Sequence, residues 1–224
     1  KQKTTLNIKM KLAIPKIAST ALLVCDIQEV FRPLIHGMSS LITTSEFLVT
    51  SATHLQLPIV VTEQYPKAMK HTVSELSSIW TQSDAIRAAE TTTTSSNPFI
   101  PTAVFEKTKF SMCTNELQTH LNSLAIESVI LCGIETHICV LQTALELLAQ
   151  GIEVHIPIDA VSSVRSFDRT VALKRLEASG AIMTTSETVL FQLMGDSKHP
   201  KFRTVSKLVK EHGQFSRNHE LTHL

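Results

Sequence analysis

The cysteine at position 139 stands where an apolar segment gives way to a helical pattern. Residues 129–132 are apolar, Gly133 and a short polar turn follow, and Cys139 lies near the start of the next helix. A helix N-terminus carries partial positive charge and free N–H groups, which stabilise a thiolate. The thiolate is the nucleophilic form of cysteine, and the same N–H groups can stabilise an oxyanion when sulfur attacks a carbonyl. Cys139 is therefore the candidate nucleophile.

The other three cysteines do not share this position. Cys25 and Cys132 lie inside apolar strand patterns, where a thiol usually serves as a small hydrophobic side chain. Cys113 lies near a loop or helix start, and we expect it to be inert. With no C-x-x-C pair and only four cysteines, neither a zinc knuckle nor a secreted disulfide scaffold is indicated.

Two charged residues at strand ends are candidates to assist the thiol. Asp26 directly follows an apolar run, where a carboxylate is either a loop anchor or a general base tuned by burial and a cationic neighbour. Lys107 follows a short strand pattern and is either a solvated side chain or that neighbour. Lys109, two residues further on, competes for the same role.

The elements that must position these residues alternate between strands and helices. Strand patterns occupy residues 20–25, 58–62, 103–105, 128–132, 152–158 and 181–184; helical patterns occupy 39–55, 115–124, 137–150 and 168–178 and continue to about 213. Continuous apolar strands between helices indicate a mostly parallel sheet covered on both faces. We therefore predict an α/β fold, a Rossmann-like three-layer αβα sandwich with about six strands.

Ligand sites in such sheets lie outside the carboxyl ends of the strands. The residues at these ends are Asp26, Glu63, Lys107, the turn 133–139 and Asp159. We therefore expect them to meet at one edge of the sheet.

The size and composition favour an ordinary globular chain. We expect one domain over residues 17–213, with tails at 1–16 and 214–224, and Met10 could be the native start. The net charge of +1 and an aromatic content of 5% give no reason to expect nucleic acid or a membrane as a partner. A cytoplasmic, reduced protein is predicted, although residues 222–224 loosely match a peroxisomal signal.

Three separated motifs resemble those of one enzyme family. They are the D-x-Q-x-x-F segment 26–31, the lysine at 107 four residues before Ser111, and the segment 133–140 followed by Thr143 and Ala144, with Asp159 and Ala160 downstream. The chain resembles the isochorismatase-like cysteine hydrolases, which include nicotinamidases and N-carbamoylsarcosine amidase. The resemblance covers roughly residues 17–195 and is closest to the eukaryotic isochorismatase-domain-containing proteins.

This resemblance implies a catalytic triad. Cys139 would be the nucleophile, Asp26 the base and Lys107 the stabilising cation, with Lys107 preferred over Lys109 because of its spacing to Ser111. It also implies a cis peptide bond between Ile134 and Glu135, which would orient backbone N–H groups, including that of Cys139, as an oxyanion hole. Phe31 and Tyr65 are expected to line the substrate pocket, and the family implies a homo-oligomer.

The chain departs from nicotinamidases in the segment that binds their metal. Glu63 keeps a carboxylate and His71 keeps a histidine, but Tyr65 stands at the middle position and is a poor zinc ligand at neutral pH. Two candidate ligands are fewer than the three of a catalytic zinc site, so we predict no metal and no other cofactor. His137 is an alternative base, but residues two apart on a helix point to different faces.

These patterns predict a metal-independent cysteine hydrolase of a small amide or related C–N substrate. Isochorismate itself is disfavoured because vinyl-ether hydrolysis needs no thiol. The alternative is a catalytically decayed interaction or scaffold module of the same fold, which the altered metal segment motivates. Nucleic-acid cleavage is a third hypothesis, and no basic stripe interleaved with aromatic residues supports it.

Overall fold

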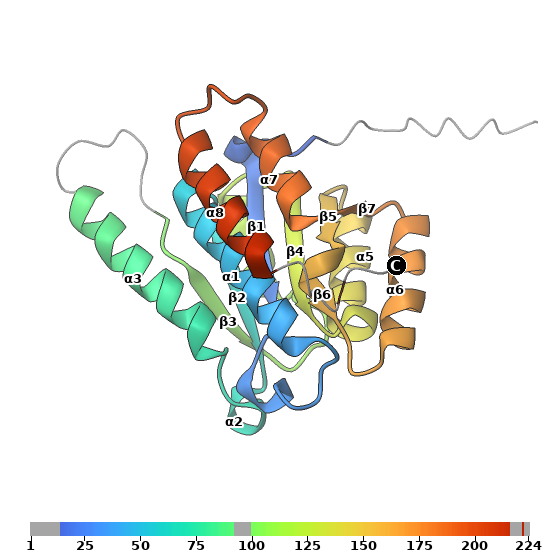
Figure 1. Cartoon of the computed structure of the whole chain (residues 1–224). Helices are drawn as coiled ribbons and strands as arrows, with labels where there is room; N and C mark the ends of the chain where they lie inside the picture. Colours follow the sequence, from blue (N-terminus) through green and yellow to red (C-terminus); the bar gives the residue numbers. More distant parts are fainter. Residues whose placement is uncertain (1–13, 92–99, 216–220, 222–224) are drawn as a thin grey trace, which may run out of the picture.

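A single parallel sheet organises the molecule. The computed structural model describes residues 14–91, 100–215 and Leu221. Its strands run in the order β3–β2–β1–β4–β5–β7, and β6 pairs with β4 beside this path (Figure 1). They are β1 (Thr20–Cys25), β2 (Ile59–Gln64), β3 (Ala103–Lys107), β4 (Ser128–Ile134), β5 (Glu153–Pro157), β6 (Val161–Ser162) and β7 (Ile182–Thr184), all paired in parallel. The predicted α/β class is confirmed.

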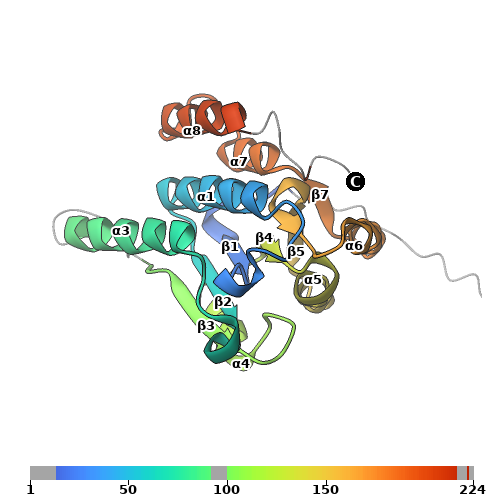
Figure 2. The same ribbon diagram turned by 60° about the horizontal axis from the view of Figure 1, so that its bottom comes forward.

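Helices cover both faces of the sheet, as Figure 2 shows end-on. One face carries α1 (Met38–Leu55), α3 (Ser74–Thr91) and α7 (Ser186–Met194), with α8 (Phe202–Phe215) packed outside α1 and α7. The other face carries α4 (Asn115–Ser123), α5 (Leu141–Ala149) and α6 (Ser166–Ala178). The short α2 (Pro66–Met69) follows β2 at the carboxyl edge of the sheet, which is the lower edge in Figure 1. The three-layer sandwich follows from this arrangement.

The central strand β1 explains why both faces need a cover. Every residue of β1 is buried. Leu22 and Val24 belong to the core beneath α1 and α7, whereas Leu23 and Cys25 belong to the core beneath α4, α5 and α6. Because side chains alternate across a strand, a continuous apolar run must be buried on two sides.

The helical layer differs in two places from the sequence prediction. Helix α3 was not predicted, because polar residues dominate its sequence; among its described side chains, Leu76 and Trp80 are buried. The helix expected at 137–150 begins instead as a π-helical turn, η3 (Thr136–Val140), which leads into α5. The Ser/Thr-rich segment 91–96, whose composition predicts an exposed loop, lies outside the described residues apart from Thr91.

Smaller differences concern the edges of the fold. The sheet gains a seventh strand, β6, which has only two residues and therefore left no periodic pattern in the sequence. Helix α8 ends at Phe215, and Leu221 beyond it is buried. Among the described residues, no helix combines the length and apolar character that crossing a membrane requires.

Candidate active site

Asp26 occupies the carboxyl end of the central strand and is almost fully buried, with 2% of its surface exposed. Its backbone adopts a left-handed conformation, with φ +52°. Both carboxylate oxygens accept hydrogen bonds: Oδ1 from Thr62 Oγ1 at 2.7 Å and Oδ2 from Lys107 Nζ at 2.6 Å. The neighbouring strands β2 and β3 thus supply the groups that hold this carboxylate.

Lys107 ends β3, and none of its side-chain surface is exposed. Besides Asp26, its ammonium donates to Gln64 Oε1 at 2.6 Å and to the carbonyls of Phe110 at 2.9 Å and Lys109 at 3.1 Å. The Lys109 side chain turns elsewhere and pairs with Glu146 on α5 at 2.7 Å. Of the two candidate lysines, only Lys107 therefore contacts Asp26.

Burial and charge shift the pKa values of this pair. Burial raises the pKa of Asp26, and this outweighs the opposing effects of Lys107, Thr62 and Cys139. For Lys107 burial acts to lower the pKa, but Cys25, Asp26 and Cys139 together raise it above the usual value. The lysine consequently stays cationic, while the carboxylate is a stronger base than an exposed aspartate.

Cys139 lies in η3, 8% exposed, beside this ion pair. Hydrogen bonding to the Cys139 side chain is among the interactions that lower the pKa of Asp26. Thr143, one turn further along α5, donates from Oγ1 to the Cys139 carbonyl at 2.6 Å and accepts from the Met112 N–H at 2.8 Å. The structure thus brings Asp26, Lys107 and Cys139 together from β1, β3 and the turn after β4.

The turn before Cys139 has an unusual backbone. Gly133 has φ +119°, and a Cβ there would lie 2.1 Å from the Cys25 carbonyl oxygen, so only glycine fits. The Ile134–Glu135 peptide bond is cis, as expected. The Glu135 carbonyl accepts from the N–H groups of Ile138 and Val140 at 3.0 and 3.2 Å. The Ile134 side chain is buried in the core beneath α1.

The Glu135 and His137 side chains face β6 and α6. Glu135 Oε2 accepts from the Val164 N–H at 2.9 Å. His137 Nδ1 lies 3.0 Å from Ser163 Oγ, and Nε2 lies 3.9 Å from Asp168 Oδ2. These contacts connect the turn to the segment before α6 and to α6 itself.

The residues at the positions of the nicotinamidase metal site form hydrogen bonds with one another. Glu63 Oε2 lies 2.8 Å from His71 Nδ1, and Oε1 accepts from the N–H and Oγ1 of Thr72 at 2.7 and 2.8 Å. Burial acts to raise the pKa of Glu63, but Thr72 and His71 lower it below the usual value. Tyr65 is 50% exposed. These residues do not fit a catalytic metal, and the described part of the chain holds no cluster of three His, Cys, Asp or Glu side chains arranged for one.

The two residues expected to line the substrate pocket differ in burial. Phe31 is partly buried and packs against the core beneath α1, whereas Tyr65 is half exposed and its backbone N–H donates to the Lys107 carbonyl at 2.8 Å. Asp159 accepts from the N–H and Oγ of Ser186 and so caps α7. The sequence did not indicate Gln64, which ends β2 opposite Lys107, because that position follows only from the register between β2 and β3.

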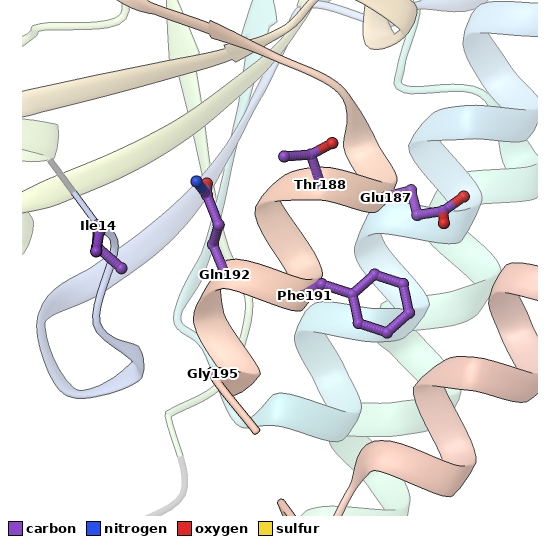
Figure 3. Close-up of a pocket in the computed structure, with 6 residues that line it drawn as sticks. All are labelled: Ile14, Glu187, Thr188, Phe191, Gln192 and Gly195. Atoms are coloured by element: carbon purple, nitrogen blue, oxygen red, sulfur yellow. The ribbon is translucent and has the colours of Figure 1, made fainter. Parts of the chain in front are cut away.

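A surface hollow of about 500 Å³ lies elsewhere on the molecule (Figure 3). It is lined by Ile14, Glu187, Thr188, Phe191, Gln192 and Gly195. Ile14 precedes β1 and Gly195 ends α7, so this hollow lies toward the amino edge of the sheet. It is therefore separate from the Asp26–Lys107 pair.

The comparison with known families agrees with the motifs and the geometry. A sequence profile of the isochorismatase domain matches residues 20–188, which is most of the chain and includes Asp26, Lys107 and Cys139. The chain belongs to the isochorismatase family. This membership makes it an isochorismatase-like hydrolase by family and confirms the resemblance predicted from the sequence.

Individual isochorismatase relatives align over nearly the whole chain. The secreted isochorismatase effector Isc1 of Phytophthora sojae is 43% identical over 196 residues, 87% of this chain and 86% of that protein. Isochorismatase domain-containing protein 1 of Salmo salar is 41% identical over 86% of this chain and 62% of its own length.

Solved structures give the same fold. The MAR1 ribonuclease of Caenorhabditis elegans has a TM-score of 0.77 and 42% identity, with 88% of this chain and 93% of that chain covered. The Escherichia coli YcaC gene product, described as an octameric hydrolase of unknown specificity, has a TM-score of 0.75 at 19% identity, with 92% and 94% covered. At that identity the second likeness concerns the fold alone.

Proposed function

We propose that this isochorismatase-family chain is a metal-independent cysteine hydrolase of small amides or related C–N compounds. The observation that carries the proposal is the buried Lys107–Asp26 ion pair, 2.6 Å long, beside the Cys139 thiol. A base, a cation and a nucleophile at one edge of the sheet are the parts that acyl transfer through sulfur requires.

In the proposed reaction Asp26 first removes the proton of the Cys139 thiol. The thiolate attacks the carbonyl carbon of the amide, and backbone N–H groups of the turn, including that of Cys139, stabilise the oxyanion. Asp26 then gives its proton to the departing nitrogen, which leaves an acyl group on the sulfur. Asp26 next removes a proton from water, and the resulting hydroxide hydrolyses the thioester.

Lys107 has an electrostatic task in this sequence. Its ammonium is held by Asp26, Gln64 and two main-chain carbonyls, so it is fixed before substrate arrives. A cation fixed there stabilises the negative charge shared by the carboxylate and the sulfur while the proton is transferred. The raised pKa of Asp26 suits it to exchange protons with both sulfur and water.

The names of two relatives suggest two other reactions for this chain. The Phytophthora protein is named an isochorismatase and the Caenorhabditis protein a ribonuclease. Hydrolysis of the isochorismate enol ether needs no thiol, and an RNA phosphate at this site would find the donors of Lys107 already occupied by protein acceptors. A scaffold role without catalysis is the remaining alternative.

The test separates these functions by their dependence on Cys139. Wild type, Cys139→Ala and the matched control Cys113→Ala are incubated with electrophilic amides and aldehydes, and adducts are read by intact mass. The same proteins are assayed on a carboxamide panel, isochorismate and RNA. We expect one adduct and amide turnover in wild type and Cys113→Ala, both lost in Cys139→Ala. Equal labelling of Cys139→Ala, or turnover of isochorismate or RNA that survives this substitution, would refute the proposal.

We further propose a cytoplasmic homo-oligomer. The four cysteines are free, in keeping with a reducing compartment, and the octamer described for YcaC is an assembly built on the same fold. Light scattering on the purified chain and a fluorescent fusion test these two points. A monomer, or secretion as in the name of the Phytophthora relative, would contradict them.

A further inference from the structure

The second cysteine at this edge of the sheet, Cys25, is not used by the proposed reaction. It is the last residue of β1, fully buried, and its Sγ donates to Asp26 Oδ2 at 3.6 Å. Consecutive side chains of an extended strand point to opposite faces. The left-handed backbone at Asp26 ends that alternation and lets the neighbouring thiol and carboxylate meet.

Cys25 and Cys139 also meet each other. Their side chains belong to one packed cluster, between the sheet and the helices α4, α5 and α6, and the interaction with Cys139 contributes to the raised pKa of the Cys25 thiol. The strand that leads to Cys139 runs directly against Cys25, because Gly133 is opposite it in the β1–β4 register and has no Cβ. Two free thiols therefore share one carboxylate.

The two thiols differ in their access to solvent. Cys139 retains 8% of its surface, whereas Cys25 has none. Burial, followed by the hydrogen bond to Cys139, raises the pKa of the Cys25 thiol well above its usual value. A solvent oxidant would therefore react with Cys139 first, while Cys25 stays a protonated thiol beside it.

We propose that Cys25 and Cys139 form an oxidative modification site, in which a hydroperoxide oxidises Cys139 and Cys25 resolves the product as a disulfide. This inference uses the reactivity of Cys139 but not amide turnover. It assigns a chemical role to a cysteine that the sequence indicated only as a small core residue.

Both steps balance. Asp26 takes the Cys139 proton, and the thiolate attacks the terminal oxygen of the hydroperoxide. The O–O bond breaks, and the expelled hydroxide or alkoxide takes that proton from Asp26 and leaves as water or an alcohol, while sulfur becomes a sulfenic acid. Asp26 Oδ2 accepts the Cys25 proton, and the Cys25 sulfur attacks the sulfenic sulfur. The S–O bond breaks, and hydroxide leaves as water with the proton from Asp26. In sum, two thiols lose two hydrogens, and one hydroperoxide is reduced.

The disulfide would switch hydrolysis off reversibly. With its sulfur bonded to Cys25, Cys139 cannot attack a carbonyl. Bonding also prevents further oxidation of the sulfenic acid to sulfinic acid, which common dithiols do not reverse. A dithiol reductant would restore both thiols by exchange.

The experiment reads the bond directly and requires no substrate. Wild type, Cys25→Ser and the control Cys113→Ser, whose thiol belongs to the same cluster, receive an excess of hydrogen peroxide and then an alkylating reagent. Intact mass and non-reducing peptide maps follow. We expect a cross-linked peptide joining Cys25 to Cys139 in wild type and Cys113→Ser, removed by dithiothreitol. In Cys25→Ser we expect no cross-link and accumulation of the sulfinic form of Cys139.

Wild type that yields no Cys25–Cys139 peptide, or one joining Cys139 to Cys113, overturns the inference. So does a Cys25→Ser protein in which the reductant restores the free Cys139 thiol as fully as in wild type. If Cys25→Ser does not fold, Cys25→Ala is used, and the wild-type peptide map decides by itself. A cross-link in a protein that hydrolyses no amide would refute the proposed function and leave this site standing.

Discussion

Two buried cations, Lys107 and Arg169, hold different parts of this fold. Lys107 donates to the carboxylate of Asp26, to the Gln64 amide and to two carbonyls at the carboxyl edge of the sheet. Arg169, on α6 and 4% exposed, donates to the carbonyls of Val161 at 2.9 Å, Leu221 at 3.1 Å, and Ile158.

The kind of acceptor distinguishes their tasks. A carboxylate can take and release a proton, so a cation bound to it influences chemistry. Main-chain carbonyls cannot titrate, so a guanidinium bound to them fixes the chain. Burial lowers the pKa of Arg169, whereas Cys25, Asp26 and Cys139 raise the pKa of Lys107 despite burial. We therefore expect losses at Lys107 to appear in activity and losses at Arg169 in stability.

The largest effect is expected at Lys107. Lys107→Met removes the cation and should lower kcat/KM about 10³-fold, the order associated with loss of an acid–base or nucleophile-activating group. Lys107→Arg keeps the charge but should recover only part of the activity, because a planar guanidinium cannot reproduce the contacts of an ammonium. Steady-state kinetics on the best amide measure both variants. Full activity of Lys107→Met would show that Lys107, like Arg169, has a purely structural role.

The complementary substitution is Arg169→Met. It leaves buried carbonyls without their donor and should cost about 3 kcal/mol of unfolding free energy. Activity per folded molecule should stay near wild type. Urea unfolding gives the stability, with Arg165→Met as the matched control, because that exposed arginine pairs with Asp168 and should contribute below about 1 kcal/mol. A strong loss of kcat without loss of stability would erase the distinction.

Gln64 tests how tightly Lys107 must be positioned. Its Oε1 accepts from Lys107 Nζ at 2.6 Å, and its backbone N–H donates to Gln28 Oε1 at 2.8 Å. Gln64→Leu removes one acceptor, worth about 1 kcal/mol, and should reduce kcat about fivefold with KM little changed. Gln64→Glu restores an acceptor and should recover part of the rate. An unaltered kcat in Gln64→Leu would show that the other three acceptors suffice.

The smallest effect is a displacement of the pH profile. Because burial raises the pKa of Asp26, activity should fall, as pH decreases, at a pH above that of an exposed aspartate. The Thr62 hydrogen bond lowers this pKa, so Thr62→Val should move the acidic limb to still higher pH. The pH dependence of kcat/KM in both proteins measures the shift. A limb that moves down, or not at all, would remove Asp26 from the proton transfer.

The sequence could predict features that depend on apolar runs and strand ends. The buried run before Asp26 identified β1 correctly, and the rule that sites lie at the carboxyl ends of parallel strands placed Asp26 and Lys107 at one edge. The side-chain partners were harder to predict, because they come from strands distant in sequence. Gln64 carries no motif of its own, and its contact with Lys107 exists only because β2 and β3 pair in that register.

Local conformation was the other gap. The contact between the Cys25 thiol and Asp26 depends on the left-handed backbone at Asp26, a conformation that aspartate adopts rarely and that no neighbouring residue signals. Likewise, the expected helix around Cys139 begins as a π-helical turn, a distinction that apolar spacing alone cannot make.

Gly133 gives the site an unusual genetic property. Since a methyl group there would collide with the Cys25 carbonyl, every single-nucleotide missense change at this codon should displace the backbone that carries Cys25 and Asp26. In a random library screened for turnover, active clones should therefore carry no substitution at position 133, as at the nucleophile itself. In a variant survey of this gene, intolerance at codon 133 would mark backbone spacing rather than chemistry, and laboratory evolution toward new substrates should leave this codon fixed.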